Sequence, residues 1–104
     1  METITFYYRA TCPHSRMVET ALKKKRIPYT LVDIQTADTE ALDQLKSITG
    51  GYLSVPTLVF ADGRTLVEPS VSALMGIIKK HYPELIPDKS KNSFFSFLKK
   101  KGQS

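Results

Sequence analysis

The stretch of sequence that decides the fold is ITFYYRATCPHS, residues 4–15. Its first five residues are all β-branched or aromatic, which predicts a buried strand that ends before the polar Arg9. Pro13 suits the first turn of a helix, because the N–H that proline lacks would be unpaired there. The stretch therefore predicts a strand, a short loop and a helix that extends to about Arg26, before Ile27-Pro28 stops it.

Strands and helices continue to alternate after this first helix, in which the apolar residues Met17, Val18, Ala21 and Leu22 recur at helical spacing. We expect a strand over residues 29–34, a helix over 38–47, and strands over 55–60 and 65–67 joined by a turn at 61–64. Ser70 is the expected cap of a last helix. This order predicts an α/β fold in which a four-stranded mixed sheet is flanked by three helices that cover both of its faces.

Length and composition narrow the class of protein. A chain of 104 residues is expected to form one domain, over residues 1–86, with a linker at 83–87 and a basic, Phe/Lys-rich extension over 87–104. The sequence has no apolar run long enough to span a bilayer and no signal-peptide pattern at its start, and its single cysteine suits a reducing compartment. We therefore expect a cytoplasmic protein.

The net charge of +5 raises the question of a nucleic-acid partner. Residues 1–87 carry ten Lys/Arg against nine Asp/Glu, whereas residues 88–104 carry five Lys against one Asp. Because nearly all of the excess lies in the extension, we expect no nucleic-acid partner. Cys12, His14 and His81 are too few and too badly spaced for structural zinc, so we expect no metal site.

Cys12 is the candidate nucleophile. A thiol attacks disulfides as the thiolate, and a helix N-terminus or nearby cations lower its pKa. Cys12 directly precedes the expected helix, Arg9, His14 and Arg16 are close in sequence, and Ser15 offers a hydroxyl one turn inside the helix. Without such neighbours, a lone cysteine is more often a small buried apolar residue than a nucleophile. The second feature that favours function is Val55-Pro56, where a cis proline leaves backbone groups free to pair with an extended thiol peptide.

These motifs resemble those of a known family. Thr11-Cys12-Pro13-His14-Ser15 resembles a glutaredoxin active site, and Ser54-Val55-Pro56 resembles the Thr-Val-Pro motif of that family. The order and spacing of the following motifs are similar to the mycoredoxin-like branch of glutaredoxins: Gly50-Gly51, Ser54-Val55-Pro56-Thr57, Phe60, Asp62-Gly63, Leu66 and Pro69-Ser70. The resemblance covers about residues 2–82 and implies a thioredoxin-like fold.

The resemblance also implies an activity: a monothiol thiol-disulfide oxidoreductase that reduces mixed disulfides between client proteins and a low-molecular-weight thiol. Cys12 would be the nucleophile. Glutathione or mycothiol would be the cosubstrate, with no tightly bound cofactor. The residues that would bind this thiol are Arg9, Thr11, Pro13, His14, Ser15, Val55, Pro56 and Ser70. His14 would either shield the sulfur or act as a local base or cation.

Two residues depart from the family pattern. Ser15 replaces the second cysteine of dithiol members, so Cys12 has no resolving partner within the chain. Glu68 lies where many glutaredoxins have glycine, which argues against tight glutathione binding.

Three alternatives stay open at this point. Monothiol relatives can bridge an iron–sulfur cluster between two subunits, although those relatives usually have glycine after the cysteine. Omega-like glutathione transferases share a Cys-Pro-x-Ser motif, but they need a following helical domain. A non-enzymatic adaptor, tethered by the extension, is the third.

The extension has three candidate roles of its own. Phe94, Phe97 and Leu98 share one side of a helix that would be followed by Lys99, Lys100 and Lys101. Residues 90–101 are therefore expected to dock on protein, either the chain's own domain or a second copy, to contact an anionic membrane, or to stay disordered.

Overall fold

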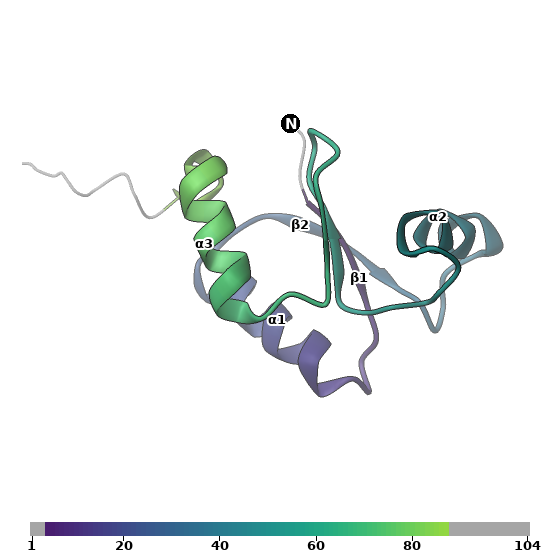
Figure 1. Ribbon diagram of the computed structural model, residues 1–104. Helices are drawn as coiled ribbons and strands as arrows, with labels where there is room; N and C mark the ends of the chain where they lie inside the picture. The colour runs from purple at the N-terminus through teal and green to yellow at the C-terminus, as the bar shows by residue number, and fades with distance from the viewer. Residues whose placement is uncertain (1–3, 88–104) are drawn as a thin grey trace, which may run out of the picture.

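The computed structural model describes residues 4–87, and its elements follow the expected order (Figure 1). In chain order they are β1 (Ile4–Tyr8), α1 (Pro13–Lys24), β2 (Tyr29–Asp33), α2 (Thr39–Thr49), β3 (Thr57–Val59), β4 (Thr65–Val67), α3 (Val71–His81) and a 3₁₀ helix (Pro83–Leu85).

The four strands form one mixed sheet in the order β2-β1-β3-β4. β1 pairs with β2 in parallel and with β3 antiparallel, and β3 pairs with β4 antiparallel. Figure 1 shows α1 and α3 on one side of this sheet and α2 on the other. The expected four-stranded mixed sheet with helices on both faces is confirmed.

The core consists of two clusters, one on each face of the sheet, and β1 contributes to both. Ile4 and Phe6 point to the side of α1 and α3, whereas Tyr7 points to the side of α2. This alternation follows from the two-residue period of a strand. On the larger side, β1 packs against residues of α1, β3 and α3 that are fully or almost fully buried: Val18, Leu22, Leu58, Leu74 and Ile78.

Several expected boundaries differ from the observed ones. β3 begins at Thr57 rather than at residue 55, since Pro56 has no N–H to donate to a ladder. α1 ends at Lys24, because Arg26 takes a left-handed φ of 59° that stops the helix before Pro28. The expected linker contains the 3₁₀ turn Pro83–Leu85.

Met17, one of the apolar residues at helical spacing in α1, is not part of the core. Its side chain is 61% exposed. The buried stripe of α1 consists of Ser15, Val18 and Leu22, and Met17 lies beside this stripe on the side of the helix that turns away from the sheet.

Tyr82, at the C-terminal end of α3, packs against the β3–β4 hairpin and hydrogen-bonds to it. Its hydroxyl donates to the Asp62 carboxylate, with distances of 2.8 Å to Oδ1 and 2.7 Å to Oδ2, and its ring stacks on Phe60 at 4.3 Å between centroids. Burial, followed by the bond to Asp62, raises the pKa of Tyr82. The C-terminal end of α3 is therefore held by both an apolar contact and a charge-assisted hydrogen bond.

No helix within residues 4–87 is long and apolar enough to cross a membrane. The expected extension lies outside the described residues apart from Pro87, so its three candidate roles and the domain boundary stay predictions.

The cap of α2 provides a direct test of the local forces in this fold. Asp38 accepts a hydrogen bond from the Ala41 N–H at 2.9 Å, so Asp38→Ala is expected to lower the free energy of unfolding by about 1 kcal/mol in urea denaturation. Asp43→Ala, in the exposed interior of the same helix, is the matched control and should not lower it, because alanine is the better helix former. Equal losses in the two variants would contradict the capping role.

Candidate functional site

The strand register brings the candidate residues to one end of the sheet. Tyr7 of β1 is opposite Thr57 of β3, and Thr57 is opposite Val67 of β4. Three segments therefore meet at this end of the sheet: the loop after β1, the segment before β3 and the loop after β4. These three segments contain the candidates: residues 9–15, Val55-Pro56 and residues 68–70.

Cys12 is the N-cap residue of α1. Its backbone is extended, with φ −95° and ψ 113°, and its Sγ accepts a hydrogen bond from the Ser15 N–H at 3.5 Å. Its own N–H donates to the Arg9 carbonyl at 3.0 Å, which closes the turn between β1 and the helix. The thiol is half-buried. A side chain at this position faces the unpaired N–H groups and the positive end of the helix dipole.

Several donors lower the pKa of the Cys12 thiol below its ordinary value. The largest contribution is a hydrogen bond from the Ser15 side chain, and the Ser15 backbone N–H comes next. Burial acts in the opposite direction, while the His14 N–H and the charge of Arg9 each lower the pKa further. The expected stabilisation of the thiolate is therefore due mainly to Ser15, and Arg9 has a smaller part than its charge suggests.

Ser15 is completely buried behind the thiol. Its Oγ lies 3.5 Å from the Arg9 N–H, which donates to it. The residue that stands in the place of a second cysteine thus joins the loop after β1 to the first turn of α1. A hydroxyl there can donate to a sulfur anion, but it cannot attack a disulfide.

His14 connects the start of α1 to the start of α3. Its Nε2 lies 2.7 Å from the Pro69 carbonyl oxygen, so Nε2 carries the hydrogen and donates. Sequence reasoning missed this partner. No pattern signals it, because the acceptor is a backbone carbonyl 55 residues away.

The Val55–Pro56 peptide bond is cis, as the motif led us to expect. The sheet pairing of β3 starts only at Thr57, so Val55 precedes the ladder. The Pro56 carbonyl accepts the Glu68 N–H at 2.7 Å, which fixes the loop after β4 next to this bond.

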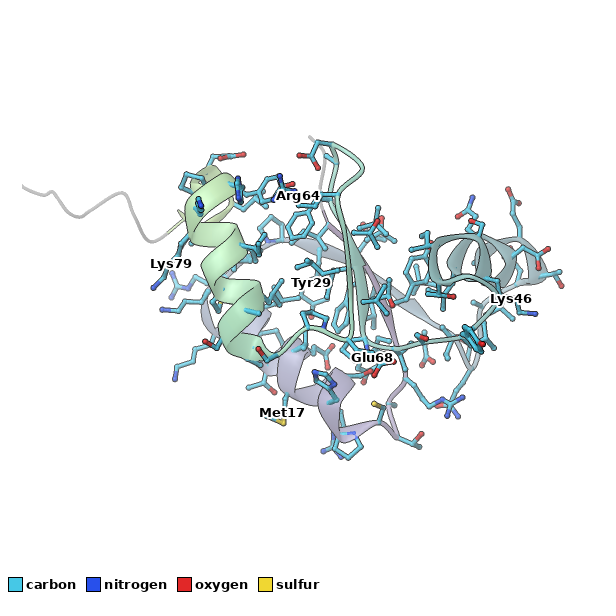
Figure 2. All side chains as sticks on the ribbon, in the orientation of Figure 1. Met17, Tyr29, Lys46, Arg64, Glu68 and Lys79 are labelled. Atoms are coloured by element: carbon cyan, nitrogen blue, oxygen red, sulfur yellow. The ribbon has the colours of Figure 1, made fainter. Side chains whose placement is uncertain are left out.

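Glu68 and Ser70 form the entrance to α3. Ser70 is the N-cap, and its Oγ accepts the Ala73 N–H at 3.1 Å. Glu68 takes a φ of 52°, a left-handed conformation that favours glycine. Figure 2 shows Glu68 on the loop between β4 and α3, and its side chain is exposed. It directly precedes Pro69, whose carbonyl accepts the hydrogen bond from His14. The helix N-terminus that would attract an anion therefore has a negative charge nearby.

The remaining candidates lie on the rim of the site. Arg9, Thr11 and Pro13 are all exposed around the half-buried Cys12. Arg9 contacts the site through both its N–H and its carbonyl. Within residues 4–87 no group of three or more His, Cys, Asp or Glu side chains is placed to hold a metal ion.

Comparison with solved structures identifies the fold. A glutaredoxin from Archaeoglobus fulgidus superposes with a TM-score of 0.64 at 24% identity, covering 76% of this chain and 88% of that one. A thioredoxin-like protein superposes with a TM-score of 0.62 at 27% identity, covering 72% of this chain and 99% of the other. The domain therefore has the thioredoxin-like fold.

Comparison with known sequences identifies the family. The family model for glutaredoxin matches residues 4–66. Two relatives from two strains of Mycobacterium tuberculosis, each named as a putative glutaredoxin, are 36% identical over 77 residues, which cover 74% of this chain and 90% of theirs. With its cysteine at the N-cap of α1 beside a cis-proline loop, this chain belongs to the glutaredoxin family.

Proposed function

We propose that this protein is a monothiol thiol-disulfide oxidoreductase, which reduces mixed disulfides between client proteins and a low-molecular-weight thiol. Family membership supports thiol-disulfide chemistry in general. The observation that carries the monothiol type is the pair at the start of α1: the pKa of Cys12 is lowered, and the position that faces its sulfur holds the hydroxyl of Ser15. The thiolate is thus activated, while no second thiol is present to resolve it.

The reaction follows from these two residues. The Cys12 thiolate attacks the small-thiol sulfur of the mixed disulfide, so a bond forms between Cys12 and the small thiol, and the client thiolate leaves and takes a proton from water. A second molecule of the small thiol, as thiolate, then attacks the mixed disulfide on Cys12. This step releases the Cys12 thiolate and a disulfide of two small thiols. Overall the client thiol is released in its reduced form and one free small thiol is oxidised, because the product disulfide joins it to the small-thiol unit that was already part of the mixed disulfide.

In this proposal the small thiol binds across the segments that meet at the site. The backbone of Val55, next to cis-Pro56, pairs with the extended thiol ligand, and Arg9 and the N-terminus of α3 at Ser70 face its polar ends. Pro13 and Thr11 border the sulfur, and Ser15 and His14 hold the helix start in place. The thiol is glutathione or mycothiol, and the likeness to mycobacterial relatives favours the mycoredoxin-like branch. A free thiol that must stay reduced between turnovers is best suited to the cytoplasm.

Ser15→Ala is expected to raise the pKa of Cys12 more than Arg9→Gln does, because Ser15 supplies the strongest hydrogen bond to the thiolate. Ultraviolet titration of the thiolate measures the pKa. Since the thiolate is the reactive form, the rate of alkylation rises with pH through this pKa and then levels off, and Ser15→Ala should move the rise to higher pH. Ser47→Ala, on the exposed surface of α2, is the matched control. A Ser15→Ala midpoint equal to that of the unmodified chain would refute the assignment.

Ser15→Cys is expected to give the protein a second activity. The unmodified chain should reduce a glutathionylated protein only when a small thiol is added, and it should reduce an intramolecular protein disulfide poorly. Ser15→Cys places a resolving thiol beside Cys12 and should reduce that protein disulfide at least about tenfold faster. Cys12→Ser should abolish both activities. Efficient reduction of protein disulfides by the unmodified chain, without small thiol, would contradict the monothiol mechanism.

Glu68→Gln tests the electrostatics of the thiol site. Removing the carboxylate near the N-terminus of α3 should lower the KM for a glutathione mixed disulfide by about threefold and leave kcat unchanged, because glutathione carries carboxylates that Glu68 repels. Glutamine has the same side-chain length, and it adopts the left-handed φ of residue 68 at a similar energetic cost. Glu84→Gln, on the 3₁₀ turn, is the control. A KM that does not change in low salt would show that Glu68 does not face the thiol.

A further inference from the structure

A groove between α1 and α3 is not explained by the thiol site. It has a volume of about 710 Å³, and its apolar lining includes Met17 of α1 and Val71 and Met75 of α3. Met17 is one of the most exposed large apolar side chains in residues 4–87, and Figure 2 shows it on the side of α1 that faces away from the sheet. A complete stripe of α1, from Pro13 to Lys24, lines this groove. Within residues 4–87, this stripe combines the apolar Pro13, Met17 and Ala21 with Thr20, Arg16 and Lys24, and an exposed apolar strip bordered by polar side chains is typical of a binding surface.

The rim of the groove is positively charged. Arg16, Lys24 and Lys25 line it, and none of its lining residues is acidic. A second hollow of about 340 Å³ shares Lys25 and Met75 with it and adds Lys79. The occupant that complements this rim carries negative charge along with apolar side chains.

The position of the groove links it to Cys12. Pro13, the residue after Cys12, lines one end of it. The twelve residues of α1 extend for about 18 Å, which matches about five residues of extended chain. One end of a peptide segment bound in the groove therefore lies close to the Cys12 sulfur.

Charge and shape distinguish four possible occupants of the groove: residues 88–104, a second copy of the chain, a membrane and a segment of another protein. Residues 88–104 carry five Lys against one Asp, so the basic rim repels them, and a second copy of the chain would oppose its own basic rim to this one. A concave groove fits a peptide segment better than it fits a flat bilayer. A short acidic and apolar segment of another protein meets both conditions.

We propose that the α1–α3 groove binds client proteins through an extended segment of about five residues with alternating acidic and apolar side chains, adjacent to the modified cysteine. This inference rests on the proposed function for the role of the modified cysteine, whereas the docking itself does not depend on catalysis. The groove would select the client, and the site around Val55 and Ser70 would hold the small thiol.

Two synthetic peptides test this proposal with the full chain. Both contain one cysteine flanked on each side by five residues, alternating leucine with glutamate in the first peptide and leucine with lysine in the second. Fluorescence anisotropy of versions with serine in place of the cysteine measures docking alone. The glutathione mixed disulfides of both peptides measure kcat/KM. The glutamate peptide is expected to bind at least about tenfold more tightly and to react with a correspondingly higher kcat/KM, and added salt should weaken its binding.

A matched pair of variants locates the binding surface. Lys24 and Lys46 are both in the last turn of a helix, but only Lys24 lines the groove. Lys24→Glu should weaken binding of the glutamate peptide about fivefold, and Lys46→Glu should leave it unchanged. Met17→Gln, at an exposed position outside the core, should weaken binding of the same peptide. All three variants should turn over a small mixed disulfide that lacks a peptide at the rate of the unmodified chain.

Other outcomes would overturn the proposal. Equal binding of the two peptides, or equal losses in Lys24→Glu and Lys46→Glu, would show that the groove does not select acidic segments. Binding to phosphatidylglycerol vesicles through Lys24, without binding of the glutamate peptide, would assign the face to a membrane. Self-association lost in Met17→Gln would assign it to a second copy, and peptide binding that appears only after deletion of residues 88–104 would assign it to that segment. Failure to turn over the small disulfide, with docking intact, would reject only the proposed function.

Discussion

The structure depends on the central position of β1. This five-residue strand uses one edge to pair with β2 and the other to pair with β3, and its side chains enter both clusters of the core. Because both edges of β1 are paired and both of its faces are packed, the position of its C-terminal end is fixed relative to the neighbouring strands and helices. The turn that follows it is closed by the bond from the Cys12 N–H to the Arg9 carbonyl. Cys12 is thus held after the end of a central strand that is paired on both edges.

The chemistry of the thiol arises from short-range donors more than from charge. Ser15 contributes both a hydroxyl and a backbone N–H, and these outweigh the charge of Arg9, which is exposed to solvent and therefore screened. Burial of the thiol opposes them. The first turn of a helix suits this role because its N–H groups have no other partner. In our proposal the same serine explains both the activation of Cys12 and the need for an external thiol.

Two charged surfaces meet at the active-site end of the domain. On one side, Glu68 places a carboxylate at the entrance to α3, beside the segment that would hold the small thiol. On the other side, Arg16 lines the α1–α3 groove near its Pro13 end, and Lys24 lines the opposite end. His14 lies between the two surfaces, since it belongs to α1 and donates to the Pro69 carbonyl. A molecule that bridges the client and thiol sides would therefore meet opposite charges at its two ends, which favours one orientation over the reverse.

The sequence by itself determined the order of the elements, the position of Cys12 at a helix start and the cap at Ser70. Each of these depends on periodicity, proline chemistry or capping, which act within a few residues along the chain. The direction of the Cys12 pKa shift was predicted for the same reason, because its strongest donors are in the next helical turn. Only the tertiary structure decided the bond from His14 to Pro69, the exposure of Met17 and the groove beside it. These features join residues more than fifty positions apart, or depend on how two helices pack over one sheet, and no local pattern encodes such distances.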